Sequence, residues 1–420
     1  MRITNRTILN YLFTIKGNFT QGHVPSPRKF DFVEIAPFKN NCQAAVTISA
    51  DFELAWAFRG RSEQLRTLNG FRTRENIPYL IKLFEKHSIP ITWATVGHLF
   101  LDNCKRGDCG RAHPEMPRPI QNTRFSGDWY KHDPCTDTLK DPIWYSPDLI
   151  QDILKSHVEH EIGTHSFSHI DFSEKYSDTE LVDKEIASCI KVMAPLKLVP
   201  RSLVFPYNNM GYSHLTSLSR NGIIAVRHRD EKICLSYPQR TSEGVYKLFE
   251  SMNTRSTKFY DYVEKAKVLI SKAKEQRSGY HLWFHPSDPF EVFSNEFRRI
   301  IEHIADEQKK GDVWVVTMTE LASYCEARKS TTIQLNRTDS DLTLYISNLF
   351  DKNKYPCTGL TLLIHDNNTY DNAICRVGGK DHRLPLQKTT LDNNNNNNKA
   401  TMITIPVDSQ IITLQRYGRA

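Results

Sequence analysis

The stretch Glu161-Ile162-Gly163-Thr164-His165-Ser166-Phe167-Ser168-His169 decides how this chain is interpreted. His165 and His169 are four residues apart and follow a short apolar run that is typical of a strand. On a helix or in a tight turn this spacing points both imidazole rings the same way. Imidazole nitrogens are common metal ligands. The spacing therefore predicts a metal-binding pair, although 16 histidines in 420 residues also produce such pairs by chance.

A metal site needs a further ligand from another strand end, and Asp51 and Glu53 are the candidates. Both follow the β-prone run 46–50. Side chains two residues apart leave a strand on the same face. At the carboxyl-end rim of a parallel barrel, that face can look into the mouth where active sites collect. One carboxylate can then bind the metal while the other acts as a general base; the alternative is a pair that faces solvent.

Two other strand ends carry groups suited to catalysis. His285 ends the apolar run 281–284 and precedes a proline, a position that suits a rim acid. The alternative is a packed or merely exposed histidine. Tyr207 follows the run 203–205, and its backbone amide can point into the mouth as a donor to an oxyanion.

Short strand-like runs alternate with helical ones between residues 41 and 328. Strands are expected at 45–50, 91–96, 161–164, 203–205, 223–226, 281–284 and 313–316. Helices are expected at 77–84, 149–154, 258–274, 294–310 and 319–327, with one more after a capping box of Ser177 and Glu180. Strands joined by helical crossovers predict a parallel sheet. Seven such units suit a closed or nearly closed barrel, so we expect an α/β fold with a seven-stranded (β/α) barrel over residues 41–328.

The segments outside this alternation have their own character. Residues 1–40 are polar and predict an N-terminal arm, and residues 98–146 predict a loop insertion over the barrel mouth. Residues 329–420 predict a small β-rich C-terminal domain, in which the run Asn393–Asn398 is expected to be an exposed loop. The strand-like runs of that domain are 332–335, 342–346, 360–364 and 402–405.

Composition argues against several classes of protein. Hydrophobic residues make up 39% and charged residues 25%, and the net charge of +7 comes from scattered Lys and Arg, so we expect no nucleic-acid partner. No apolar run approaches the roughly 18 residues that a membrane span needs. The apolar run 8–15 is interrupted by Asn10 and Tyr11 and has no cleavage site after it. This argues against a secretory signal and predicts a cytoplasmic protein.

The nine cysteines are odd in number and irregularly spaced, which favours reduced thiols over a disulfide framework. One group combines cysteines with histidines and offers two interpretations. It could hold a structural zinc ion, or it could be a loop with free thiols, which we favour. Its members are Cys104, Cys109, His113, His132 and Cys135.

Together these motifs resemble the polysaccharide deacetylase family, the NodB-homology fold of the carbohydrate esterases, over residues 44–325. That family has a distorted seven-stranded (β/α) barrel, which the resemblance implies for this chain. It carries an acidic motif after the first strand, His-[Ser/Thr]-x-x-His after the third, an Arg-Pro-Tyr-like motif and a late Leu-x-His. The stretch 160–169 is a specific match. The resemblance implies His165 and His169 as metal ligands, His285 as general acid and the Tyr207 amide as oxyanion donor.

Two positions depart from the family pattern. Asp51-Phe52-Glu53 replaces two adjacent aspartates and looks like the family's Asp-x-Asp variant, which implies Asp51 as the base and Glu53 as a ligand. Phe205 stands where the family usually places an arginine that orients the base. Arg201 or Arg227 could substitute for it.

The resemblance implies a metal-dependent hydrolase that removes N-acetyl groups from an amino sugar of a polysaccharide or glycan precursor. Its cofactor would be a divalent metal, with zinc favoured, and its partner a carbohydrate. The stretches 127–130 and 141–148 look like deacetylases of surface-polysaccharide biosynthesis, and their aromatic residues suit either sugar stacking or loop packing. The alternatives are a metal-independent hydrolase of another non-peptide C–N bond and an inactive glycan-binding homologue.

Overall fold

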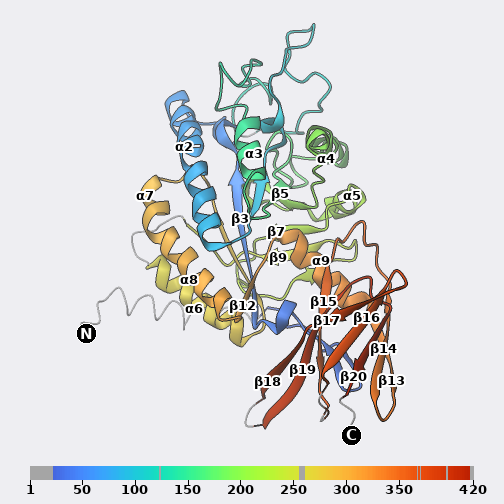
Figure 1. Ribbon diagram of the computed structural model, residues 1–420. Helices are drawn as coiled ribbons and strands as arrows, with labels where there is room; N and C mark the ends of the chain where they lie inside the picture. Colours follow the sequence, from blue (N-terminus) through green and yellow to red (C-terminus); the bar gives the residue numbers. More distant parts are fainter. Residues whose placement is uncertain are drawn as a thin grey trace, which may run out of the picture.

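The computed structural model describes residues 22–122, 124–254, 261–366, 368, 370–393 and 396–416. A curled, mainly parallel sheet with helices around it forms the body, and two smaller sheets lie at its lower end in Figure 1. The irregular chain after residue 100 lies at the opposite, upper end. Residues 1–21 of the expected arm and 258–260 of an expected helix are outside the described residues.

All seven strands expected in the barrel segment are present. They are β3 (Ala44–Phe52), β4 (Thr92–Thr95), β5 (Glu161–Thr164), β6 (Ser202–Val204), β7 (Ala225–His228), β11 (Gly279–Phe284) and β12 (Val313–Val315). Every residue of β3 is buried, as expected for a parallel strand covered on both faces. Strands β11, β3, β4, β5, β6 and β7 pair in parallel in that order, so their carboxyl ends share one rim.

The largest delay at the start of an expected strand is that of β7. We expected a strand at 223–226, but β7 starts at Ala225. The reason is that the Ile223 amide still donates to the carbonyl of Leu218, in the helix that precedes β7.

Three further strands join the central sheet, which has ten strands among the described residues. They are β8 (Gln239–Arg240), β9 (Tyr246–Phe249) and β10 (Met252–Asn253). β9 pairs in parallel with β7, and β10 pairs in parallel with β11. The segment 246–253 therefore connects the two edges of the sheet, while β12 pairs with the first residues of β3. The mixed α/β class is confirmed, and the count of seven strands around the ring remains a prediction.

Helices alternate with the strands as the crossovers require. They are α2 (Glu63–His87), α3 (Pro147–Leu154), α4 (Thr179–Met193), α5 (Leu215–Arg220), α6 (Tyr262–Glu275), α7 (Phe290–Val292), α8 (Arg298–Lys309) and α9 (Met318–Ser330). The predicted capping box is wrong by one residue. Asp178 caps α4 by accepting from the Leu181 amide, whereas the Ser177 hydroxyl donates to the carbonyl of Asp171.

Two five-stranded sheets lie beside α9 and share one apolar core, which includes Leu344 and Leu362. One contains β1 (Lys29–Phe30), β2 (Val33–Ile35), β15 (Gly359–Ile364), β19 (Asn396–Pro406) and β18 (Leu386–Asn393). The other contains β13 (Thr331–Arg337), β14 (Asp341–Asn348), β20 (Ile411–Gln415), β16 (Asn372–Val377) and β17 (Lys380–Leu384). Residues 29–35 of the expected arm are thus strands of the same sheet as the C-terminal segment.

The asparagine run forms the tip of a hairpin. β18 reaches Asn393 and β19 begins at Asn396, and these two residues pair across the hairpin. The strands therefore extend into the run that we expected to be a loop; residues 394–395 are outside the described residues.

The structure agrees with two expectations from composition. All nine cysteines lie in the described residues as free thiols, as their odd count predicts. Every helix in the described part of the chain is too short or too polar to span a bilayer.

Candidate active site

Three side chains predicted as metal ligands meet at the carboxyl-end rim of the sheet. Glu53 directly follows β3, and His165 and His169 follow β5. Glu53 Oε1 lies 3.1 Å from His165 Nε2 and 2.9 Å from His169 Nε2. All three residues are buried. The structure therefore brings together two elements that are more than 100 residues apart in sequence, with Glu53 and His165 separated by 112 positions.

The stretch from His165 to His169 is a turn rather than a helix. Ser166 and His169 have φ angles of 60° and 56°, a region that residues other than glycine rarely occupy. A buried carboxylate holds this turn, because Glu185 accepts from the Ser168 amide at 2.8 Å and from its hydroxyl at 2.6 Å. Such backbone conformations persist where the surrounding structure fixes them, and here they aim both imidazoles at Glu53.

Hydrogen bonds at Nδ1 hold the two histidines with Nε2 directed at Glu53. His165 Nδ1 lies 2.7 Å from the Val204 carbonyl, and since a carbonyl only accepts, Nδ1 carries the proton. His169 Nδ1 lies 3.1 Å from the Tyr207 hydroxyl, and burial lowers the pKa of His169 to about 4, so its ring is neutral at pH 7. Burial raises the pKa of Glu53, but hydrogen bonds from the histidines hold it well below its usual value. This donor set, with its oriented histidines, fits a divalent ion such as zinc.

Asp51 is held by an arginine from a distant strand. Arg227 Nη1 and Nη2, in β7, donate to the two carboxylate oxygens of Asp51 at 2.6 and 2.8 Å. Such a bidentate pair fixes orientation as well as charge. Burial raises the pKa of Asp51, but the charges of Arg227 and His165 and the hydrogen bonds from Arg227 together outweigh it, and the pKa lies below its usual value. His285 Nε2 lies 3.8 Å from Asp51 Oδ2, so the predicted base and the predicted acid are neighbours.

The structure decides which arginine contacts Asp51. Of the two alternatives from the sequence, Arg227 makes the contact, and Arg201 instead donates to the carbonyl of Asn353 at 2.9 Å. Phe205, at the position of the family arginine, is buried against Phe172 with ring centres 5.2 Å apart. Sequence reasoning had no signal that favoured Arg227, because its proximity to Asp51 depends on the closure of the sheet.

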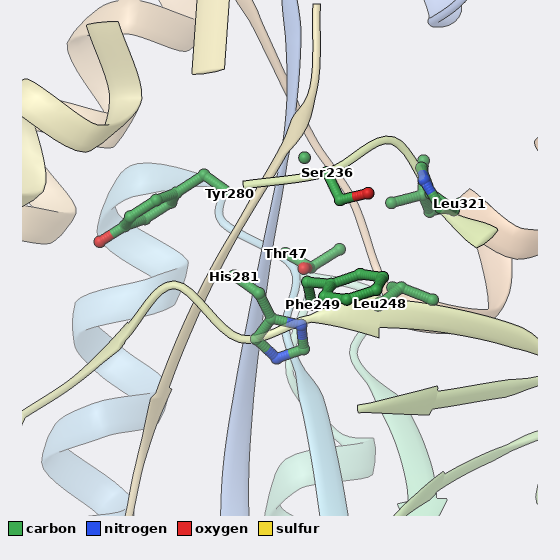
Figure 2. A pocket seen from close by; sticks show the side chains of 9 residues that line it. Thr47, Ser236, Leu248, Phe249, Tyr280, His281 and Leu321 are labelled. Atoms are coloured by element: carbon green, nitrogen blue, oxygen red, sulfur yellow. The ribbon is translucent and has the colours of Figure 1, made fainter. Parts of the chain in front are cut away.

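A layer of polar groups beneath Asp51 was also missed. Ser49 Oγ accepts from Arg227 Nη1 at 3.1 Å and lies 2.9 Å from His281 Nε2. Burial lowers the pKa of His281 to about 3, so this ring is neutral at pH 7. His281 and Thr47 also line a cavity of about 10 Å³ (Figure 2). A cavity of that size holds about one water molecule, so this layer supports the site and does not bind a substrate.

Tyr207 lies where β6 ends, in η5 (Pro206–Asn208), with a φ of 61°. Its hydroxyl contact with His169 was not predicted, since the sequence pointed only to its amide. The guanidinium of Arg124, from the expected insertion, lies 3.6 Å from the centre of the Tyr207 ring. Arg124 also donates to Asp171 Oδ2 at 2.9 Å. The insertion thus contacts the edge of the histidine cluster.

A cavity of about 320 Å³ opens beside Tyr207, which is large enough for a small ligand. It is lined by Trp56, Ala57, Arg59, Gly60, Arg61, Arg124, Phe125 and Tyr207. Tyr207 contacts His169, so this one side chain lies between the cavity and the three-residue cluster. Aromatic faces and guanidinium groups dominate its wall.

Comparisons with known proteins bear on the fold. No family model matches the sequence, and no curated protein matches it significantly. A candidate polysaccharide deacetylase from Mycobacterium smegmatis has a similar structure, with a TM-score of 0.50, 15% identity, and coverage of 76% of this chain and 99% of that one. The chain shares the polysaccharide deacetylase fold. The resemblance predicted from the motifs is therefore confirmed for the fold.

Two other solved structures are more distant. A family 4 carbohydrate esterase from Streptomyces lividans in complex with acetate has a TM-score of 0.33 and 10% identity, covering 65% of this chain and 91% of that one. A family 4 pseudoenzyme from Bacillus anthracis has a TM-score of 0.36 and 11% identity, covering 67% of this chain and 66% of that one.

Proposed function

We propose that the protein is a metal-dependent hydrolase that removes N-acetyl groups from an amino sugar of a polysaccharide or glycan precursor. The observation that carries the proposal is the convergence of Glu53, His165 and His169 beside an Asp51 that Arg227 holds in place. Glu53, His165 and His169 would hold a divalent ion, with zinc favoured. When bound, such an ion supplies positive charge that polarises a carbonyl and acidifies water.

Asp51 is the proposed general base. Its carboxylate takes a proton from water as the water oxygen attacks the acetyl carbon. Arg227 contributes by keeping Asp51 ionised and by fixing both of its oxygens, so the base does not have to reorient during the reaction. Ser49 and His281 support the guanidinium from beneath.

His285 and Tyr207 complete the reaction. The Tyr207 amide donates to the carbonyl oxygen as negative charge develops on it. His285 gives a proton to the departing nitrogen, so the C–N bond breaks and the sugar leaves as a free amine. The new C–O bond comes from water, and the second product is acetate.

The large cavity is the proposed place for the sugar. Trp56, Phe125 and Tyr207 offer aromatic faces, which suit stacking on sugar rings. The insertion 98–146 contributes one wall through Phe125 and Arg124. We propose no nucleic-acid partner, and the nine free thiols support a cytoplasmic location.

The closure of the central sheet into a barrel is part of the same proposal. We propose a distorted seven-stranded (β/α) barrel in which the segment 246–253 takes the seventh position beside β3, β4, β5, β6, β7 and β11, in place of the expected strand 313–316, which as β12 pairs with β3. We place this barrel at 41–328 and a β-rich domain at 329–420.

The alternatives are disfavoured by specific contacts. A metal-independent hydrolase has no use for three converging ligands. The inactive homologue was suggested by the missing family arginine at Phe205, and Arg227 contacts Asp51 instead.

Acetate release from N-acetylglucosamine oligosaccharides tests the proposed function. The metal-loaded full chain should release acetate, and chelation should stop it until metal is restored. A His165→Ala, His169→Ala double variant should release none, whereas His157→Ala, at an exposed position, should behave as the parent. Acetate release by the double variant would refute the metal mechanism.

A further inference from the structure

A second group of metal-ligand side chains lies away from the candidate active site. It consists of His98, Cys104, His113 and Asp133. His98 lies in η3 (Gly97–Phe100), directly after β4, and the other three come from the chain between η3 and α3. The described part of that segment contains no helix and only isolated bridges. Irregular segments of this length are uncommon in compact domains unless something else orders them.

The donor atoms of this group converge on one point. Asp133 Oδ2 lies 2.9 Å from His113 Nε2 and 3.1 Å from His98 Nε2, and the two Nε2 atoms are 3.1 Å apart. Cys104 Sγ lies 3.4 Å from the same Asp133 oxygen. In a tetrahedral zinc site, neighbouring nitrogen and oxygen donors are about 3.3 Å apart and sulfur lies about 3.6 Å from them. The distances given above are slightly shorter than these values, and here too the sulfur lies farther from the Asp133 oxygen than the nitrogen donors do.

The proton positions leave two acceptors face to face. His98 Nδ1 lies 3.3 Å from the Trp144 carbonyl and carries the proton, because the carbonyl only accepts. With that proton on Nδ1, the lone pair of the neutral ring lies on Nε2. That lone pair faces Asp133 Oδ2 at 3.1 Å. Two buried acceptors at this distance repel, and a cation between them removes the repulsion.

Neighbouring groups fix Asp133 for this role. Its Oδ1 accepts from the Cys135 amide at 2.9 Å and from the Tyr145 hydroxyl at 3.2 Å. The other oxygen, Oδ2, is thereby aimed at the two histidines. Support of a ligating carboxylate by outer hydrogen bonds is the usual arrangement at metal sites.

We propose that His98, Cys104, His113 and Asp133 form a second, structural site for a zinc-like divalent ion. The ion ties the irregular segment 101–146 to the end of β4. The Phe167 ring lies 5.8 Å from the His98 ring and 5.7 Å from that of His113, so the site packs against the turn that carries the first metal cluster. The proposal does not depend on the proposed deacetylase activity.

The ligand set differs from the group considered from the sequence. Of that group, Cys104 and His113 take part. Cys109 is exposed, and Cys135 contributes its amide to Asp133. His98 and Asp133 complete the set. His98 is the first residue of the expected insertion, and Asp133 follows His132, which belonged to the group considered from the sequence.

Cobalt substitution of the full-length protein tests this proposal. A thiolate bound to Co²⁺ gives a charge-transfer band in the near ultraviolet, and the group Glu53, His165 and His169 contains no cysteine. The wild-type protein should show the band and bind two metal ions per chain. Cys104→Ser should lose the band, and the matched variants Cys109→Ser and Cys135→Ser should keep it.

A second arm separates this site from the candidate active site. The His165→Ala, His169→Ala variant should keep the band and bind one ion per chain, whether or not the parent protein releases acetate. Absence of the band in the cobalt-loaded wild-type protein would overturn the proposal, and this readout does not require any variant to fold. A Cys104–Cys135 disulfide in freshly purified protein, or a band that persists in Cys104→Ser, would overturn it equally.

Discussion

The two groups of proposed metal ligands use similar donors but differ in how they are built. Glu53, His165 and His169 lie at the carboxyl-end rim of the sheet, and Tyr207, which contacts His169, lines a cavity of about 320 Å³. His98, Cys104, His113 and Asp133 draw three of their four donors from irregular chain. Catalytic zinc sites keep an open position, whereas structural sites close with four protein ligands. The number of donors and their surroundings therefore distinguish the proposed catalytic site at the rim from the proposed structural site in the loop.

The side chains around the two groups also favour a catalytic role for the rim group and a structural role for the loop group. The rim group has Asp51 and His285 nearby, two groups that can move protons. The loop group is enclosed by aromatic side chains, with Trp56 ring-to-ring at 4.4 Å from His98 and Tyr130 at 4.9 Å from His113. A metal ion in such surroundings can order the chain but cannot meet a substrate.

The largest effect should come from Asp51, which only the rim group has beside it. Asp51→Asn keeps the shape of the side chain but removes the base, and we expect kcat to fall about 10²- to 10⁴-fold. Both metal ions should stay bound, as measured by metal analysis after gel filtration. Asp152→Asn, on the exposed face of α3, is the control. A kcat within twofold of the parent would remove Asp51 from the mechanism.

Arg227→Lys should have the next largest effect, because lysine cannot hold both oxygens of Asp51. We expect a decrease in kcat of about 10- to 100-fold, by analogy with outer groups at metal sites. Lysine keeps the positive charge but loses the bidentate hydrogen bonds, which also lower the pKa of Asp51, so that pKa should rise. Since the base works ionised, the acidic limb of the pH–rate profile should move to higher pH.

Arg201→Lys is the matched control for this change, because Arg201 contacts the Asn353 carbonyl and not Asp51. Its pH profile should coincide with that of the parent. An unshifted acidic limb in Arg227→Lys would mean that the guanidinium does not set the ionisation of Asp51.

Tyr207→Phe should act on the rim metal alone. The substitution removes the hydroxyl beside His169 Nδ1 but leaves the amide, so the affinity for metal at the rim should fall about 10-fold. Competition with a chelator measures this change, and the cobalt–thiolate band of the other group should not move. Tyr212→Phe, at an exposed tyrosine, is the control. An equal loss of metal affinity at both groups would show that the substitution destabilises the whole fold and does not act on the rim site alone.

The smallest effect on catalysis should come from Cys104→Ser. The loop group touches no reacting atom, so its loss should change kcat little. Because the insertion supplies Arg124 and Phe125 to the cavity wall, KM should rise, by less than about 10-fold. Steady-state acetate release measures both constants, with Cys109→Ser for comparison. A decrease in kcat with unchanged KM would contradict a purely structural role.

Much of the fold was readable from local patterns. The alternation of apolar strands and amphipathic helices placed all seven expected strands, since each pattern depends only on neighbouring residues. The short strands β8, β9 and β10 were missed because their sequences are brief and their pairing with β7 and β11 is decided by closure of the sheet. Asp178 displaced Ser177 as the cap of α4 because both residues can serve, and the Ser177 hydroxyl found another acceptor.

The sequence by itself determined the residues that gather at the rim. His165 and His169 lie four apart, and Asp51 and Glu53 lie two apart at a strand end, so their positions follow from the geometry of a turn and a strand. Only the tertiary structure decided what those residues contact. Arg227 reaches Asp51 across 176 positions of sequence, and His98 reaches Asp133 through a folded loop. The spacing of residues along the chain determines how neighbouring side chains are oriented, whereas contacts between charged groups far apart in sequence depend on how the whole sheet closes.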